Sequence, residues 1–176
     1  MSSPIVLLAP GASGNPASVK PFADALVAAG MAAHVISLPR GSAERALPVY
    51  RQEAADIPAP VIGGQSFGGR VASMLAAERS VAGLVLICYP LHPPGRGERW
   101  EQRTEHWPSV ACPTLLLSGD RDPFARIELL REAVTRLPNA ELHVYPGVGH
   151  GLRAVRQDAA ERIMHFVQEV AVHSDQ

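Results

Sequence analysis

A single serine stands in the middle of a glycine-rich segment that follows an apolar run. The pentapeptide from Gly64 to Gly68, GQSFG, has the pattern of a sharp strand-to-helix turn that exposes its central serine, Ser66, above the edge of a sheet. Glycines are needed because neighbouring side chains would collide across so tight and strained a turn. The alternative is a glycine-rich strand-to-helix turn whose serine has no catalytic role. The context favours a nucleophile, because residues 60–62 are apolar and apolar side chains recur at helical spacing in residues 71–75.

A serine hydroxyl alone is too weak a nucleophile at neutral pH, so a base and an acid that orients it are required. In this type of site they follow the serine in the order acid, then histidine, each on a loop after a strand. Asp120 and Asp122 follow the apolar run 114–118, and His150 follows the run 142–145. Singly, such residues are more often surface, turn or capping residues. Their joint order predicts His150 as the base and an aspartate of this loop as the acid. Asp122 is the predicted acid because it lies further toward the loop tip, whereas Asp120, one residue after Gly119, is expected to cap the turn and is the alternative.

The first apolar run, residues 5–9, leads directly into a glycine-rich loop at positions 10–15. A loop after a buried parallel strand lies at the carboxyl edge of its sheet, where such folds bind ligands. This loop and the residue after the nucleophile usually supply the backbone N–H groups that hold an oxyanion, which predicts Ala12 and Phe67 as the donors. The alternative, a phosphate-binding loop, is weaker, because neither the Lys-Ser/Thr ending nor the full dinucleotide fingerprint is present.

Strand-like and helix-like segments alternate along the chain. Near-continuous apolar runs predict strands at 5–9, 33–38, 60–62, 82–88, 114–118 and 142–145. Helical spacing predicts helices at 16–29, 46–56 (weaker, interrupted near Pro48), 124–137 and 155–172, and one after Ser66. This alternation predicts a single-domain, three-layer α/β/α sandwich over residues 1–176, with a mostly parallel sheet of about six strands. At this length we expect no separate cap domain.

Composition narrows the classes of partner and cofactor. With 47% hydrophobic residues, 19% charged residues and a formal net charge of −1, the chain has no basic stripe that would attract nucleic acid or an anionic membrane. Its N-terminus has neither the cationic region nor the long apolar run of a signal peptide, so we expect a cytoplasmic protein. Cys88 and Cys112 are then expected to be buried, reduced thiols. The sequence offers no zinc-ligand spacing, and we predict no metal or cofactor.

The segment from Pro90 to Pro113 is the longest connection, and connections of this length in a compact domain are usually functional or disordered. Its aromatic and basic residues make His92, Trp100 and Arg103 candidate substrate contacts. Gln65, beside the nucleophile, is a fourth. Trp100 and Trp107 could line an acyl pocket, and an arginine could pair with a substrate carboxylate. The alternative is a solvated helix, because glutamates alternate with the arginines.

Four motifs together resemble the α/β-hydrolase superfamily, and within it the small bacterial hydrolases related to dienelactone hydrolase. They are GQSFG at 64–68, YPLHPPG at 89–95, GDRDPF at 119–124 and GVGHG at 147–151. The resemblance covers nearly the whole chain from Ile5 onward and implies an eight-stranded ancestor, so the first two strands, an antiparallel edge, are expected to be absent. Relatives often have His-Gly where this chain has Pro10-Gly11, and the closest group often has Lys in place of Gln65.

These observations predict a serine hydrolase that cleaves a small ester, lactone or thioester through an acyl-enzyme. Ser66 attacks, His150 takes its proton, Asp122 orients His150, and the N–H groups of Ala12 and Phe67 hold the oxyanion. The alternative is a noncatalytic binding or scaffold protein, because the superfamily also includes a eukaryotic subunit of a chromatin-modifying complex and a fold does not guarantee catalysis. Substrate identity and oligomeric state are left open.

Overall fold

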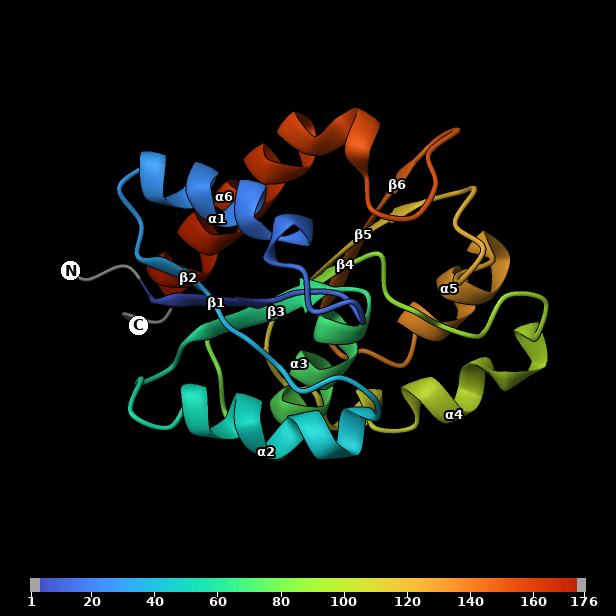
Figure 1. Cartoon of the computed structure of the whole chain (residues 1–176), viewed down its shortest axis with the longest axis horizontal. Coiled ribbons are helices and arrows are strands. Elements are labelled where there is room, and N and C mark those ends of the chain that lie inside the picture. Colours follow the sequence, from blue (N-terminus) through green and yellow to red (C-terminus); the bar gives the residue numbers. More distant parts are fainter. Residues whose placement is uncertain (1–3, 174–176) are drawn as a thin grey trace.

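The computed structural model describes residues 4–173, which build one twisted sheet of six parallel strands (Figure 1). The strand order is β2-β1-β3-β4-β5-β6, and every neighbouring pair is parallel. The strands are β1 (Val6–Ala9), β2 (Ala33–Val35), β3 (Val61–Gln65), β4 (Gly83–Ile87), β5 (Thr114–Gly119) and β6 (Ala140–Tyr145). The prediction of a mostly parallel sheet of about six strands is confirmed, and no antiparallel strand occurs within residues 4–173.

Helices cover both faces of the sheet and complete the predicted three layers. In Figure 1, α1 and α6 lie above the sheet, and α2, α3 and α4 lie below it. The helices are α1 (Lys20–Ala28), α2 (Ala43–Glu53), α3 (Phe67–Glu78), α4 (Trp100–Thr104), α5 (Ile127–Val134) and α6 (Arg156–His173). Among residues 4–173, none of them combines the length and apolarity that crossing a bilayer requires.

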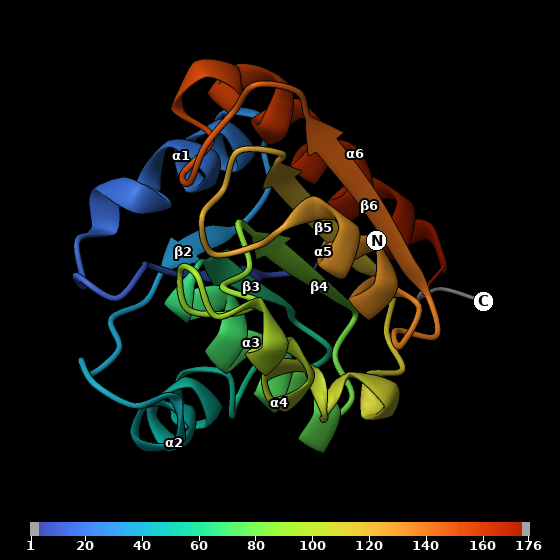
Figure 2. The same ribbon diagram turned by 90° about the vertical axis from the view of Figure 1, so that its right-hand side faces the viewer.

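Two hydrophobic cores, one on each face, explain why the central strands β1, β3, β4 and β5 are buried along their whole length, whereas the edge strands β2 and β6 are partly exposed. Alternate residues of a strand point to opposite faces, so Leu86 packs with α2 and α3 whereas Val85 packs with α1 and α6. Both residues are fully buried, as expected for a parallel sheet that is covered on both sides. Figure 2 shows the arrowheads of β4, β5 and β6 at one edge of the sheet. The loops after these strands therefore meet at that edge.

Helix α2 begins earlier than the sequence predicts and passes through Pro48 without interruption. Ser42 caps it, because its hydroxyl accepts the N–H of Arg45 at 3.3 Å. The helix is held against the sheet by Tyr50, whose hydroxyl lies 2.8 Å from the carbonyl oxygen of Leu7 and 2.7 Å from that of Gly63. This burial outweighs the one helical hydrogen bond that proline removes.

Other boundaries also differ from the predicted ones. Strand β2 ends at Val35 rather than Leu38, and β6 begins at Ala140 rather than Leu142. The predicted helix 124–137 is shortened to α5, because the backbone of Arg126 directly before it is not helical, with φ −57° and ψ 128°. Asp122 Oδ1 accepts the N–H of Phe124 at 2.8 Å, and His92 Nε2 accepts the N–H of Arg126 at 3.0 Å. Together with the hydrogen bond from the Ala125 N–H to the Asp122 carbonyl oxygen at 3.2 Å, these bonds hold the turn that precedes α5.

The long connection between β4 and β5 is ordered rather than structureless. It forms α4 and two single-turn helices, Gly97–Arg99 and Trp107–Ser109. Trp107 is fully buried and meets the Tyr89 ring edge-on, with ring centroids 4.9 Å apart. The connection is therefore part of the core on the α3 side of the sheet.

Candidate active site

Ser66 lies between β3 and α3, at the carboxyl edge of the sheet. Its backbone has φ 51° and ψ −116°, a strained conformation for a residue other than glycine, as the sequence predicts. A Cβ atom on Gly64 would lie 2.5 Å from the carbonyl oxygen of Ala9, and one on Gly68 would lie 2.3 Å from the same oxygen. The turn therefore needs both glycines, because it packs directly against the end of β1.

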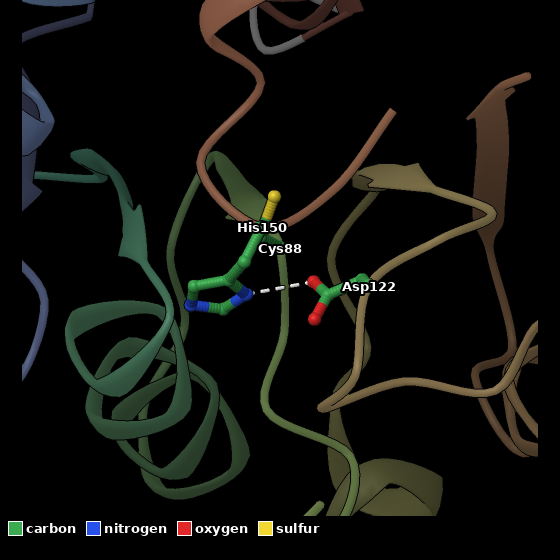
Figure 3. A group of neighbouring side chains, drawn as sticks. All are labelled: Cys88, Asp122 and His150. Carbon is green, nitrogen blue, oxygen red and sulfur yellow. Dashed lines mark hydrogen bonds and ion pairs between the residues drawn. The ribbon is translucent and has the colours of Figure 1, made fainter. Parts of the chain in front are cut away.

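Asp122 and His150 come from the loops after β5 and β6, and the fold brings them together. The distance between Asp122 Oδ2 and His150 Nδ1 is 2.7 Å, and the Asp122 side chain is completely buried (Figure 3). An ionised carboxylate can only accept a hydrogen bond, so Nδ1 carries the proton and donates it. The other ring nitrogen, Nε2, is left with a lone pair and points away from Asp122 in Figure 3.

Close backbone contact between the two loops sets this geometry. A Cβ atom on Gly119 would lie 2.0 Å from the carbonyl oxygen of Val148, so only glycine fits at the end of β5. The same oxygen accepts the N–H of Arg121 at 3.0 Å. The Phe124 ring then packs on the imidazole of His150, with ring centroids 4.7 Å apart. Motif spacing alone does not reveal Gly119 or Phe124 as positioning residues.

Asp120, the alternative acid, has a different role in the structure. Its side chain is exposed, and Oδ1 accepts the N–H of Gly147 at 2.7 Å. Asp120 therefore caps the turn that leads toward His150, as its place beside Gly119 suggests. The structure brings Asp122, not Asp120, into contact with His150.

The loop predicted to help hold an oxyanion lies beside the Ser66 turn. A Cβ atom on Gly68 would also lie 2.5 Å from the carbonyl oxygen of Pro10, so this loop and the start of α3 are in contact. The loop is held by a hydrogen bond from the Gly11 N–H to Ser18 Oγ at 3.2 Å. Within residues 4–173, the N–H groups of Ala12 and Phe67 have no hydrogen-bond acceptor. Both are therefore available to a ligand.

Gln65, directly before the serine, contacts the histidine. Its Nε2 lies 3.3 Å from Nε2 of His150, and its Oε1 lies over Gly11. Among the described residues 4–173, Ser66 Oγ makes no hydrogen bond with His150. The nitrogen that a serine nucleophile would need is thus occupied by Gln65 in this structure.

Cys88 is a site residue that sequence reasoning missed. It follows β4 directly with φ 51°, and its Sγ accepts the N–H of Gly151 at 3.2 Å, which holds the loop beside His150 (Figure 3). Sγ and ligand-type atoms of Asp122 and His150 lie within 4.8 Å of one another. Burial raises the pKa of the Cys88 thiol to about 12, so the thiolate that binds metals is disfavoured. We interpret Cys88 as a loop anchor.

Both thiols, Cys88 and Cys112, are free, as predicted for reduced cysteines, although Cys112 is only half-buried.

A cavity of about 460 Å³ lies between the amino ends of β5 and β6 and helix α6. It is at the edge opposite Ser66, whereas parallel sheets of this kind bind ligands at the carboxyl edge. Its position therefore does not support a role in chemistry at Ser66.

The other three predicted substrate contacts have partners within the protein. His92 is buried, accepts the Arg126 N–H and contacts the carbonyl oxygen of Pro93 at 2.8 Å. Trp100 lies under the guanidinium of Arg136, 4.5 Å from its ring centroid. Arg103 donates to the carbonyl oxygen of Pro90 at 2.8 Å. The structure does not bring these side chains into contact with His150, and their binding of substrate stays a prediction.

Comparison with known proteins gives partial matches in sequence. The chain is 36% identical to a non-heme haloperoxidase of Rhodococcus erythropolis over 67 residues. The aligned segment covers 37% of this chain and 24% of that protein. Over 66 residues it is 39% identical to a poly(3-hydroxyalkanoate) depolymerase of Ectopseudomonas oleovorans, which is 36% of this chain and 23% of that protein. The matched segment thus spans about a quarter of these curated relatives.

Solved structures match over nearly the whole chain. The monoacylglycerol lipase of Paleococcus ferrophilus has a TM-score of 0.84 at 14% identity, covering 97% of both chains. Est1E from Butyrivibrio proteoclasticus has a TM-score of 0.80 at 16% identity, covering 96% of this chain and 88% of that one. These likenesses show the fold. Residues 42–175 also match the model of a family described as an alpha/beta hydrolase domain, and the chain belongs to this family.

Proposed function

We propose that this chain is a serine hydrolase that cleaves a small ester, lactone or thioester. The observation that carries the proposal is the 2.7 Å contact between His150 Nδ1 and the buried carboxylate of Asp122, at the sheet edge that also carries Ser66. The contact leaves the His150 Nε2 lone pair as a proton acceptor. The strained backbone at Ser66 is typical of a nucleophile turn. Together these features fit the roles of a base, its orienting acid and a nucleophile.

In the proposed reaction, Ser66 Oγ attacks the substrate carbonyl while His150 Nε2 accepts its proton. The N–H groups of Ala12 and Phe67 donate to the oxyanion, and Asp122 stabilises the imidazolium. The imidazolium then protonates the leaving group, which departs as the acyl-enzyme forms. Water attacks the acyl-enzyme with His150 again as base, releasing the acid and restoring Ser66. These steps require no redox partner.

The proposed substrate class rests on the relatives. The relatives include a poly(3-hydroxyalkanoate) depolymerase and a monoacylglycerol lipase, and the compounds in both names contain ester bonds. Their identity or coverage is too low to transfer a particular substrate, so we propose only the substrate class, a small ester, lactone or thioester. A screen of p-nitrophenyl esters and thioesters of graded acyl length, with Ser66→Ala as the blank, measures the preferred acyl group.

The alternative is a noncatalytic α/β-hydrolase-fold binding or scaffold protein. Incubation with a fluorophosphonate separates the two, because only an activated serine is phosphonylated at a useful rate. We expect a single adduct that mass spectrometry maps to Ser66, with none on Ser66→Ala. His150→Gln is expected to abolish labelling as well, since it removes the base. Labelling of another residue, or none on folded protein, would sink the hydrolase proposal.

A further inference from the structure

The side chain of Gln65 bridges two parts of the candidate site. It is 7% exposed, and its two polar atoms have different surroundings. Nε2 lies 3.3 Å from His150 Nε2. Oε1 lies so close to Gly11 that a Cβ atom there would be only 2.4 Å away. One amide therefore contacts both the base and the loop that holds Ala12, and the absence of a side chain at Gly11 makes room for it.

The proton on His150 fixes the orientation of this amide. Because Nδ1 donates to Asp122, Nε2 has a lone pair and no proton, so it can only accept a hydrogen bond. The amide group of Gln65 must therefore present its NH₂ to His150 and its oxygen to Gly11. The reverse orientation would place two acceptors against each other. The contact is a hydrogen bond from Gln65 to the lone pair that Ser66 needs.

We propose that Gln65 is a positioning residue that holds His150 in a resting geometry and competes with Ser66 for Nε2. Its N–H donates to the neutral imidazole and stabilises that protonation state, because imidazolium has no lone pair to accept the bond. Catalysis begins when Nε2 exchanges Gln65 for Ser66 Oγ. The competition rests on the proposed function, whereas the contact between Gln65 and His150 does not.

Besides the neutral amide of Gln65, two titratable side chains face His150. Asp122 contacts Nδ1, and Sγ of Cys88 lies within 4.8 Å of ligand-type atoms of Asp122 and His150. Burial raises the pKa of Cys88 to about 12, so the thiol keeps its proton through the neutral range. The Phe124 ring that packs on the imidazole has no charge. Changing Gln65 alone leaves these neighbours in place, so a change in the titration of His150 reports on the amide.

Two substitutions that keep the length of the Gln65 side chain test the N–H donor apart from the space that the side chain fills. Gln65→Met removes both polar atoms, and Gln65→Glu keeps the oxygen next to Gly11 but loses the N–H donor when ionised. We expect the midpoint of the His150 imidazole titration, followed by NMR from about pH 5 to 9, to rise by about 0.4 to 1 pH unit in Gln65→Met. In Gln65→Glu it rises further, because a carboxylate favours imidazolium. The NMR signals of the His150 ring are identified by their loss in His150→Gln.

An unchanged or lower midpoint in both variants, each shown to be folded by circular dichroism, overturns the proposal. Should Gln65→Met not fold, Gln65→Glu gives the same test, because the upward shift is required there too. A merely structural role would lower activity without moving the titration.

The rate of fluorophosphonate labelling against pH tests the competition itself. In Gln65→Met the acid limb is expected to move up with the NMR midpoint, and the alkaline plateau is expected to rise above that of the wild type, because a competitor for Nε2 is gone. A plateau at or below the wild-type level contradicts the competition. If the wild type is never labelled but the NMR midpoint shifts, the hydrolase proposal fails and the contact stands. If labelling is normal and the midpoint does not move, the contact fails and the hydrolase proposal stands.

Discussion

Replacement of Asp122 by asparagine tests the orientation of the base with little change in shape. The two carboxylate oxygens have separate partners, because Oδ1 accepts the Phe124 N–H at 2.8 Å and Oδ2 accepts the His150 Nδ1 proton at 2.7 Å. An asparagine can accept only one of these bonds. The Phe124 N–H is always a donor, whereas a neutral imidazole can move its proton to the other nitrogen. The amide oxygen is therefore expected to remain on Phe124, with its NH₂ facing Nδ1.

This arrangement places the His150 proton on Nε2, where it blocks proton transfer from Ser66. On the precedent of serine proteases, the wrong tautomer lowers kcat by about 10⁴-fold, which corresponds to about 5 kcal/mol of activation free energy. Stability is expected to change little, because the buried N–H of Phe124 keeps its acceptor. The assay is the steady-state hydrolysis of a short p-nitrophenyl ester, corrected with Ser66→Ala, alongside the rate of fluorophosphonate labelling.

Asp120→Asn is the matched control. It changes the same residue type in the same loop, but the asparagine oxygen can still accept the Gly147 N–H that Oδ1 accepts now. Its kcat is expected to stay within about threefold of the wild type, because Asp122 keeps its contact with His150 and a surface change of this kind alters stability by only about 0.5 kcal/mol. The assignment of Asp122 is wrong if Asp122→Asn retains more than a tenth of the wild-type kcat, or if Asp120→Asn is the variant that loses activity.

Two further predictions concern stability. Gly68→Ala would place a Cβ atom 2.3 Å from the Ala9 carbonyl oxygen. Because this clash is with backbone, we expect the substitution to lower the free energy of unfolding by at least about 2 kcal/mol. Urea unfolding measures the change, and an unchanged urea midpoint would contradict the prediction. Burial, and then the nearby Arg70, lower the pKa of His106 to about 4. The unfolded chain therefore binds more protons between about pH 6.5 and 4, and stability falls as pH decreases through that window, by about 1 to 2 kcal/mol after screening. In His106→Gln the amide can still donate to Ser73 Oγ, which lies 2.8 Å from His106 Nε2 in the wild type. The free energy of unfolding, measured with urea, is therefore expected to change less between pH 7 and 4.5 in this variant than in the wild type. An equal fall in both proteins would remove His106 as its cause.

Local patterns determined the type and order of the elements. Continuous apolar runs predict buried parallel strands because both faces of such a sheet are covered, and all six predicted strands occur. The GQSFG turn was predictable because its glycines meet backbone at short range. Chain order placed Asp122 and His150 on loops after β5 and β6, since parallel strands end at one edge of the sheet.

Element boundaries depended on contacts that no local pattern shows. Helix α2 continues through Pro48 because Tyr50 anchors it to backbone oxygens of β1 and β3. Helix α5 starts late because the backbone of Arg126 is not helical, and the Arg126 N–H is bound by His92, 34 positions away in the chain. In the same way, Trp107, a candidate for an acyl pocket by sequence, is buried against Tyr89.

The inner arrangement of the candidate site was decided by tertiary structure alone. Asp120 and Asp122 have the same chemistry two positions apart, and the packing of their loop against residues 147–150 brings Asp122 to His150 and Asp120 to the Gly147 N–H. The roles of Gln65 and Cys88 depend on His150 and Gly151, which are 85 and 63 positions away. Sequence periodicity reports which face of an element is buried, but a hydrogen bond between distant side chains exists only after the strands and loops have packed.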